Sequence, residues 1–180
     1  MGSDETDAFV SPLDYPMFIV TVAEPGNDLG APVRPSADPV PASGRAMSGC
    51  LVGFATQCSI EPFRLLVCIS KANHTYALAR IAAVLGLHVL DSGQRDLARL
   101  FGETTGDEVD KFGLCSWRRG PEGLPILDGC AAWMVAAVRQ RIDLGDHVGF
   151  LLEPVEVHSR PGAAALPFSK VSDLQAGHGA

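Results

Sequence analysis

The stretch "SGCLVGFATQCSIEPFRLLVCISKANHTY" (residues 48–76) decides the fold. Residues 48–59 and 64–70 are short runs of small and β-branched side chains, a composition that favours buried strands over helices. Between them lies Pro62, and because the residue before a proline avoids the helical region, we predict a turn there. The stretch therefore predicts two neighbouring strands that lead into a polar loop.

The hydrophobic period changes after this stretch. In "NHTYALARIAAVLG" (73–86), apolar residues recur at helical spacing, Asn73 can serve as the N-cap and Gly86 as the stop, so we predict a helix over 73–86. "LHVL" (87–90) predicts a brief strand, and "SGQRDLARLFG" (92–102) predicts a short helix. We expect residues 103–123, which are polar and broken by glycine, to be mostly loop.

The outer parts of the chain add more strands. "MFIVTVA" (17–23) predicts a strand, and residues 24–46, with five prolines and three glycines, predict a flap or hairpin insertion without regular structure. The last third predicts two long strands, 130–142 and 147–157, joined at the triplet Gly145-Asp146-His147. We expect residues 8–170 to form a single domain and 171–180 to be a tail.

This order of elements predicts an α+β, mostly β architecture. We expect a mainly antiparallel barrel with one or two short helices packed on it. A doubly wound parallel sheet would need regular strand–helix alternation and a glycine-rich phosphate turn, and the sequence has no G-x-G-x-x-G motif.

Composition limits the class of partner. With 180 residues, a net charge of -7 and an isoelectric point near 5.1, the chain lacks the basic surface that nucleic acid or an anionic membrane would need. No apolar run approaches the length of a membrane span, about 18 residues, so we expect a soluble, cytoplasmic protein. Five cysteines without a C-x-x-C pair indicate buried, reduced thiols, and the scattered histidines indicate no metal site.

Polar groups interrupt the apolar runs at two places. Thr56, Gln57 and Ser59 end the first run; they either satisfy turn amides or converge on an anionic or heteroaromatic ligand. The second group lies between a predicted strand and a predicted helix start, where free amides favour an anion, and we expect it to bind a phosphate. It comprises Ser70, Lys71, Asn73, His74 and Thr75.

Taken together, these segments resemble the flavin reductase family of FMN-binding split β-barrels, from about Met17 to about Lys170. The resemblance is carried by the opening stretch, "LHVLDSGQRDLARLFG", Lys111-Phe112, "LPILDGCAAW" and "GDHVGFLLEPVEV". It implies a homodimer with FMN near the subunit interface, the phosphate among Ser70 to Thr75, and the ring against a flavin-facing stretch. That stretch comprises Val52, Gly53, Phe54 and Ala55, followed by Thr56, Gln57 and Ser59. Many members have threonine and small polar residues where this chain has "LVGF", so Phe54 either stacks on the ring or blocks part of its site.

The hairpin triplet supplies the candidate for substrate positioning. Gly145 suits a tight or positive-φ turn, Asp146 can fix the imidazole tautomer, and the resemblance implies that His147 lies near the flavin and the nicotinamide. The alternative is a turn histidine that faces water.

The resemblance implies an NAD(P)H-dependent FMN reductase. Hydride would pass from the nicotinamide to flavin N5, and the reduced flavin to an acceptor such as a partner monooxygenase. The alternative is a non-catalytic FMN, deazaflavin or tetrapyrrole binding protein on the same fold.

Overall fold

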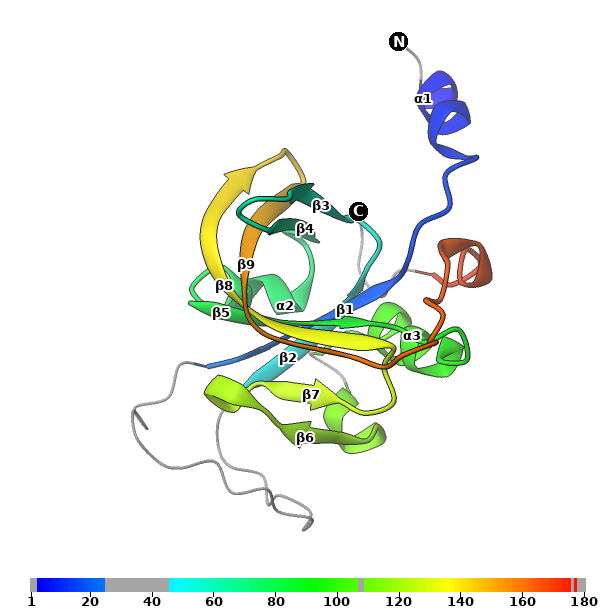
Figure 1. Ribbon diagram of the computed structural model, residues 1–180. Coiled ribbons are helices and arrows are strands. Elements are labelled where there is room, and N and C mark those ends of the chain that lie inside the picture. Colours follow the sequence, from blue (N-terminus) through cyan, green and yellow to red (C-terminus); the bar gives the residue numbers. More distant parts are fainter. Residues whose placement is uncertain (1–2, 25–45, 107–108, 176, 178–180) are drawn as a thin grey trace.

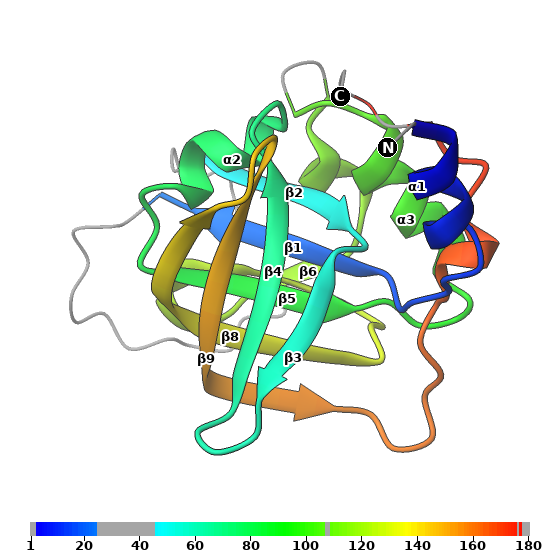
Figure 2. The same ribbon diagram turned by 90° about the horizontal axis from the view of Figure 1, so that it is seen from above.

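The computed structural model describes residues 3–24, 46–106, 109–175 and 177. The body is a curved seven-stranded sheet with strand order β2-β1-β5-β8-β9-β4-β3, and every neighbouring pair is antiparallel (Figures 1 and 2). Its strands are β1 (Phe18–Ala23), β2 (Met47–Val52), β3 (Ala55–Ser59), β4 (Arg64–Ser70), β5 (Val84–Val89), β8 (Ala132–Asp143) and β9 (His147–Ser159). The prediction of a mostly antiparallel sheet with few helices is confirmed.

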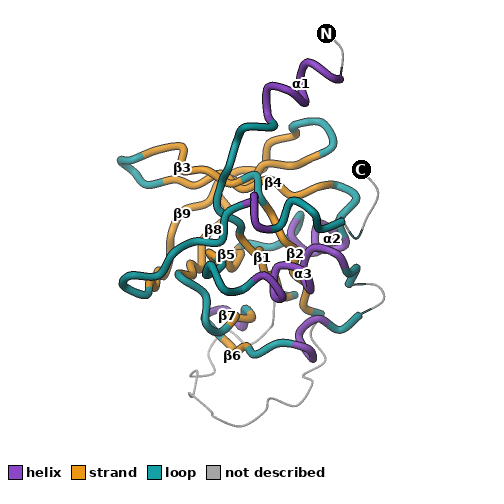
Figure 3. Tube along the Cα trace, turned by 90° about the vertical axis from the view of Figure 1, so that its right-hand side faces the viewer, coloured by secondary structure: helices purple, strands orange, loops and turns teal. Residues whose placement is uncertain are grey.

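The remaining elements lie around this sheet (Figure 3). A two-stranded ribbon consists of β6 (Trp117–Arg119) and β7 (Pro125–Leu127). The α-helices among the described residues are α1 (Ser3–Val10), α2 (His74–Ala79) and α3 (Arg95–Glu103). Short 3-10 helices cover Lys111–Leu114, Pro121–Gly123 and Phe168–Lys170. The helix expected over 92–102 is confirmed as α3. The sequence predicted neither α1 nor the two-stranded ribbon, whose first strand, β6, lies in the stretch 103–123 that we expected to be mostly loop.

The single strand predicted over 48–59 is wrong, because it divides at Gly53 and Phe54. β2 pairs with β1, whereas β3 pairs with β4, so β2 and β3 form opposite edges of the sheet. A side chain at position 53 would collide with Tyr15, since an added Cβ would lie 2.4 Å from its ring. The Phe54 carbonyl accepts a hydrogen bond from the Cys68 N–H (2.9 Å), which anchors the turn against β4.

The helix predicted over 73–86 is wrong in its second half. α2 ends at Ala79, and β5 begins at Val84, earlier than the strand predicted over 87–90. β5 lies between β1 and β8, and Leu85 and Leu87 are buried there. Gly86 lies opposite Thr21 of β1, and the Thr21 side chain occupies the space beside it, because a Cβ on Gly86 would lie 2.3 Å from Thr21 Oγ1. Pairing on both edges therefore overrides the local helical pattern.

The β8–β9 hairpin confirms the two long strands predicted in the last third. Gly145 has φ +106°, the positive value that the triplet led us to expect. Register shifts after Val135 and Val138 interrupt the ladder. Such bulges increase twist, and the hairpin follows the curve of the sheet in Figure 2.

Buried polar side chains connect the outlying elements to the sheet. The His88 ring bridges the Ile19 carbonyl (Nδ1, 3.2 Å) and the Leu127 N–H (Nε2, 3.2 Å), and so connects β5 with β1 and β7. The Lys111 ammonium is buried and donates to the carbonyls of Gly49 (3.2 Å) and Phe101 (3.3 Å). Burial lowers the pKa of Lys111. Lys111 therefore links the 3-10 helix 111–114 to β2 and α3.

Three further expectations concern the cysteines, the proline-rich flap and membrane spans. All five cysteines are free thiols, and Cys50 and Cys130 are buried, but Cys58 is exposed on β3, so the expectation of buried thiols is wrong for that residue. The proline-rich flap at 24–46 lies almost wholly outside the described residues. Within the part of the chain that is described, no helix has the length and apolar character needed to cross a membrane.

Candidate functional site

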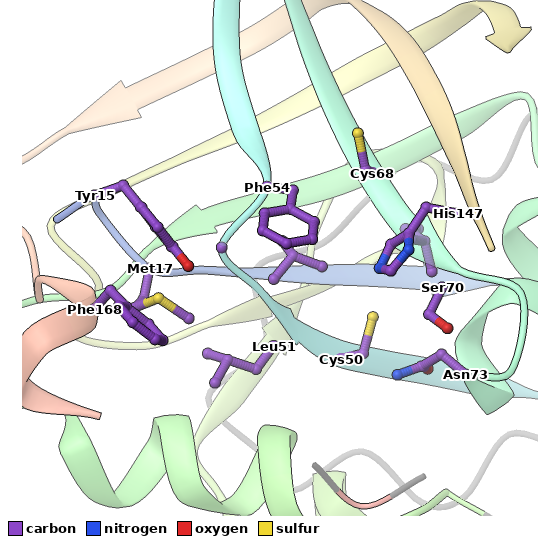
Figure 4. A pocket seen from close by; sticks show the side chains of 13 residues that line it. Tyr15, Met17, Cys50, Leu51, Phe54, Cys68, Ser70, Asn73, His147 and Phe168 are labelled. Carbon is purple, nitrogen blue, oxygen red and sulfur yellow. The ribbon is translucent and has the colours of Figure 1, made fainter. Parts of the chain in front are cut away.

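A pocket of about 180 Å³ lies where the β2–β3 turn meets the start of β9 and the segments that carry Tyr15 and Phe168 (Figure 4). It is lined by Tyr15, Met17, Cys50, Leu51, Val52, Gly53, Phe54, Cys68, Ile69, Ser70, Asn73, His147 and Phe168. Figure 4 shows aromatic and apolar side chains at one end and polar side chains at the other. The pocket is therefore suited to a ligand whose two ends differ in polarity.

The polar end is built by strand pairing. Ser70 ends β4 directly opposite His147, the first residue of β9, and Asn73 follows as the N-cap of α2. Ser70 Oγ accepts a hydrogen bond from the Ala72 N–H (3.2 Å), and Asn73 Oδ1 accepts one from the Thr75 N–H (2.9 Å). These bonds fix both side chains beside the imidazole.

The His147 imidazole is oriented by its neighbour. Its Nδ1 lies 2.9 Å from Asp146 Oδ1, and this hydrogen bond holds the pKa of Asp146 below its usual value. When Nδ1 donates to the carboxylate, Nε2 is the nitrogen left for a ligand. The ring also lies 5.4 Å from the Phe54 ring, at 58° to it, and the side chain is 26% exposed. His147 thus lies at the pocket, between the hairpin turn and the β2–β3 turn.

The floor and the opposite end are apolar. Burial raises the pKa of the Cys50 thiol to about 11, so the thiol stays protonated at neutral pH and is a poor nucleophile. At the far end the Tyr15 and Phe168 rings stack with centroids 4.9 Å apart. Phe54, 58% exposed, lies between this pair and His147. The pocket therefore offers aromatic surface along most of its length.

The structure brings together only part of the predicted flavin-facing stretch. Val52, Gly53 and Phe54 line the pocket, whereas β3 carries the following residues away from it. The Ala55 N–H donates to the Gly53 carbonyl (2.9 Å). Thr56 and Gln57 are exposed and bond locally, to the carbonyls of Gln57 (3.2 Å) and Ser59 (3.1 Å). The Thr56 and Gln57 side chains thus bond to neighbouring carbonyls and not to turn amides, and a ligand role for Thr56, Gln57 and Ser59 stays a prediction.

The predicted phosphate-binding group also divides. Ser70 and Asn73 line the pocket, but Lys71 forms an ion pair with Asp143, its Nζ lying 2.9 Å and 3.0 Å from the two carboxylate oxygens. Thr75 is buried, and its hydroxyl lies 2.9 Å from Ser48 Oγ. The His74 ring lies beside Gly106, at which an added Cβ would be 2.8 Å from His74 Cδ2.

Sequence reasoning missed the aromatic end of the pocket. Tyr15 and Phe168 lie near opposite ends of the chain, and no local period connects them. Each adjoins a proline, and Pro16 and Pro167 form an isolated antiparallel bridge. The contact joins residues that are far apart in the sequence, and no local pattern indicates it.

Known proteins share both sequence and fold with this chain. The model of the flavin reductase like domain matches residues 11–171. The chain is 31% identical over 113 residues to FMN reductase (NADH) RutF of Pseudomonas syringae pv. syringae, an alignment that covers 62% of this chain and 63% of that protein. It is 33% identical over 100 residues to the flavin-dependent monooxygenase reductase subunit HsaB of Mycobacterium tuberculosis, covering 53% and 52% of the two chains. The chain thus spans less than two thirds of the length of either relative.

A solved structure agrees in fold. The NADH:FAD oxidoreductase SgcE6 of Streptomyces globisporus C-1027 superposes with a TM-score of 0.74 at 23% identity, covering 93% of this chain and 89% of that one. The superposition shows that the two chains share a fold. The chain belongs to the family of flavin reductase like domains.

Proposed function

We propose that the protein is an NAD(P)H-dependent flavin reductase that binds FMN in the pocket between the β2–β3 turn and the start of β9. The observation that carries this proposal is the pocket itself, in which Gly53, Phe54, Ser70, Asn73 and His147 meet. Relatives whose names describe FMN reduction by NADH, and a monooxygenase reductase subunit, support the same activity.

The residues present fit a flavin. A flavin combines a flat tricyclic ring with a polar pyrimidine edge and a polar side chain, and the pocket combines aromatic rings with a polar end. Gly53 lies against the Tyr15 ring, which occupies the place that a Cβ would take, and Cys50, Leu51 and Val52 also line the pocket. The chain thus presents both kinds of surface that such a ligand needs.

A bound flavin would supply the hydride acceptor, its N5 atom, and a nicotinamide would supply the hydride. The protein's part is to place two rings in contact and to exclude water. We assign the ordering of the nicotinamide to His147, with Asp146 holding its tautomer through Nδ1. Phe54 is placed to stack against one of the two rings.

We assign the phosphate to the polar end of the pocket. Ser70 and Asn73 line that end, and the nitrogen of the Asn73 amide is the donor that we assign to the ligand, because its oxygen already caps α2. Lys71 would supply the positive charge that the phosphate needs. To do so, its ammonium group must leave its ion pair with Asp143 and bind the phosphate instead. Both side chains of this ion pair are partly exposed, so the exchange costs little.

We also propose that residues 8–170 form one domain, that the curved sheet is a split barrel, and that two copies associate. The pocket, at about 180 Å³, is smaller than the roughly 300–1,000 Å³ of typical ligand sites, which favours completion by a second copy. Val155 and Val157, both in β9, are more than half exposed, which favours their burial in a subunit contact. A monooxygenase is the partner we propose for the reduced flavin, by similarity to the HsaB subunit.

Anaerobic mixing tests the activity. FMN-loaded protein should lose its flavin absorbance when NADH or NADPH is added, and the faster of the two nucleotides is the preferred donor. Free FMN with the same nucleotide, without protein, is the control. Stable absorbance in protein that demonstrably binds FMN would favour the non-catalytic flavin-binding alternative.

A further inference from the structure

Two segments that are far apart in the sequence, those that carry Tyr15 and Phe168, build one wall of the pocket. We call Tyr15, Met17 and Phe168 the terminal wall; all three line the pocket, at the end away from His147 (Figure 4). The Tyr15 and Phe168 rings are stacked at 4.9 Å with an angle of 15° between their planes. Tyr15 also lies directly on Gly53, where a Cβ would be only 2.4 Å from its ring. The wall is therefore continuous with the β2–β3 turn, where the proposed function places the flavin ring.

Hydrogen bonds between distant segments hold the terminal wall in place. The Phe168 N–H donates to the Tyr15 carbonyl (2.8 Å), and the Met17 N–H donates to the Leu166 carbonyl (2.8 Å). The Asp14 carboxylate accepts from both the N–H (2.9 Å) and the hydroxyl (2.8 Å) of Ser169. Because these bonds fix both backbones around the stacked rings, the wall is formed before any ligand arrives, and little side-chain entropy is lost on binding.

The wall faces a pocket whose opposite end is polar. Ser70, Asn73 and His147 lie at that opposite end (Figure 4). A ligand that spans both ends presents its polar groups to Ser70 and Asn73 and a flat apolar edge to the wall. In a flavin, the flat apolar edge is the dimethylbenzene ring, and its two methyl groups are the part that an aromatic and methionine surface recognises.

We propose that the terminal wall is the binding surface for the dimethylbenzene edge of the flavin, and that Phe168 and Tyr15 determine the selectivity for a methylated ring. This inference rests on the proposed function, since it needs a flavin in the pocket. Asp14 acts as a positioning residue, because its carboxylate holds the segment that carries Phe168.

Riboflavin and 7,8-didemethylriboflavin test this assignment, because they differ only in the two methyl groups and lack the phosphate. Titrations followed by flavin fluorescence should show that the wild-type protein binds riboflavin more tightly, by about fourfold for each methyl group that contacts the wall. This factor corresponds to about 0.8 kcal/mol for one buried CH₂ group, with 1.4 kcal/mol per tenfold change in affinity. Phe168→Ala should reduce the ratio of the two affinities to nearly one.

Two further variants make the outcome decisive. Phe9→Ala removes the same ring from an exposed position on α1 that does not line the pocket, and it should leave the ratio unchanged. If Phe168→Ala fails to fold, Phe168→Leu replaces it, because leucine keeps an apolar side chain of similar size. Loss of the stacked ring pair in this variant should still lower the ratio of the riboflavin and didemethylriboflavin affinities about twofold or more. Equal binding of both flavins by wild type, or a preference that survives in the Phe168 variants, would overturn the assignment. Failure of wild type to bind any flavin would instead overturn the proposed function.

Discussion

Acidification should destabilise the protein through His88. Burial lowers the pKa of this imidazole from 6.5 to about 4, against the weaker opposing effect of the Ile19 carbonyl. The Leu127 N–H donates to Nε2, so Nδ1 carries the proton of the neutral ring and donates to Ile19. A second proton could enter only at Nε2, where it would displace the Leu127 bond. The folded state therefore disfavours the charged form.

The sign and size of the effect follow from linkage. Between pH 6.5 and about 4 the unfolded chain binds the proton and the folded chain does not, so the free energy of unfolding falls as the pH falls. One pKa unit corresponds to about 1.4 kcal/mol, so the full loss is on the order of 3 kcal/mol, of which about 2 kcal/mol appears by pH 5. Above about pH 7.5 this group contributes almost no pH dependence, because the imidazole is neutral in both states.

Urea unfolding at pH 7.5 and pH 5, for the wild type and His88→Gln, measures the effect. Gln keeps a donor and an acceptor but cannot be protonated, so the variant should be less stable at pH 7.5 and lose about 2 kcal/mol less than wild type on acidification. Lowered carboxylate pKa values, such as that of Asp143, act in both proteins and cancel in the comparison. Equal losses in the two proteins would refute the assignment of the acid sensitivity to His88.

Further substitutions test the site. His147→Ala should leave FMN affinity and thermal stability nearly unchanged, but it should raise the nicotinamide concentration needed for half-maximal reduction or slow the reduction step. Unaltered stopped-flow kinetics would show that His147 is an ordinary turn residue. Asp146→Asn should shift the pH profile of reduction and spare FMN binding, and an unchanged profile would remove its role in orienting the ring. Lys71→Ala should weaken FMN by about tenfold or more and leave riboflavin unaffected, whereas Asp143→Asn should strengthen FMN alone; equal effects on both flavins in fluorescence titrations would remove the phosphate assignment. Val157→Glu should convert a dimer to a monomer in sedimentation experiments, and a monomeric wild type would contradict the proposed association.

Much of the sheet could be predicted from the sequence because its signals are local. The apolar and alternating runs that form β1, β4 and β8 indicate strands without reference to the rest of the chain. Gly145 indicates the hairpin turn, because glycine readily adopts the positive φ found there. The first residues of β5, Val84 to Gly86, continue the helical spacing of residues 73–86, and only pairing with β1 and β8 decides for a strand there. Such pairing is a contact between distant residues, so no window of sequence contains it.

The candidate site divides in the same way. Gly53, Phe54, Ser70 and Asn73 could be predicted because they lie within or directly after the two strands of the opening stretch. Lys71 and Thr75 have the residue types of a phosphate site, but their partners Asp143 and Ser48 come from other elements. The terminal wall depends on contacts between the two ends of the chain, and residue type alone indicates neither its place nor its purpose.

Single-turnover reduction of bound FMN by nicotinamide deuterated at C4 tests the central claim most directly. The protein is loaded with FMN, mixed anaerobically with NADH or its C4-deuterated form in a stopped-flow instrument, and the loss of flavin absorbance is recorded. If the pocket brings C4 and N5 into contact, reduction is far faster than for free FMN, and deuterium on the transferred face slows it. Reduction no faster than in free solution, in protein shown to hold FMN, would contradict the claim that this pocket is the site of hydride transfer.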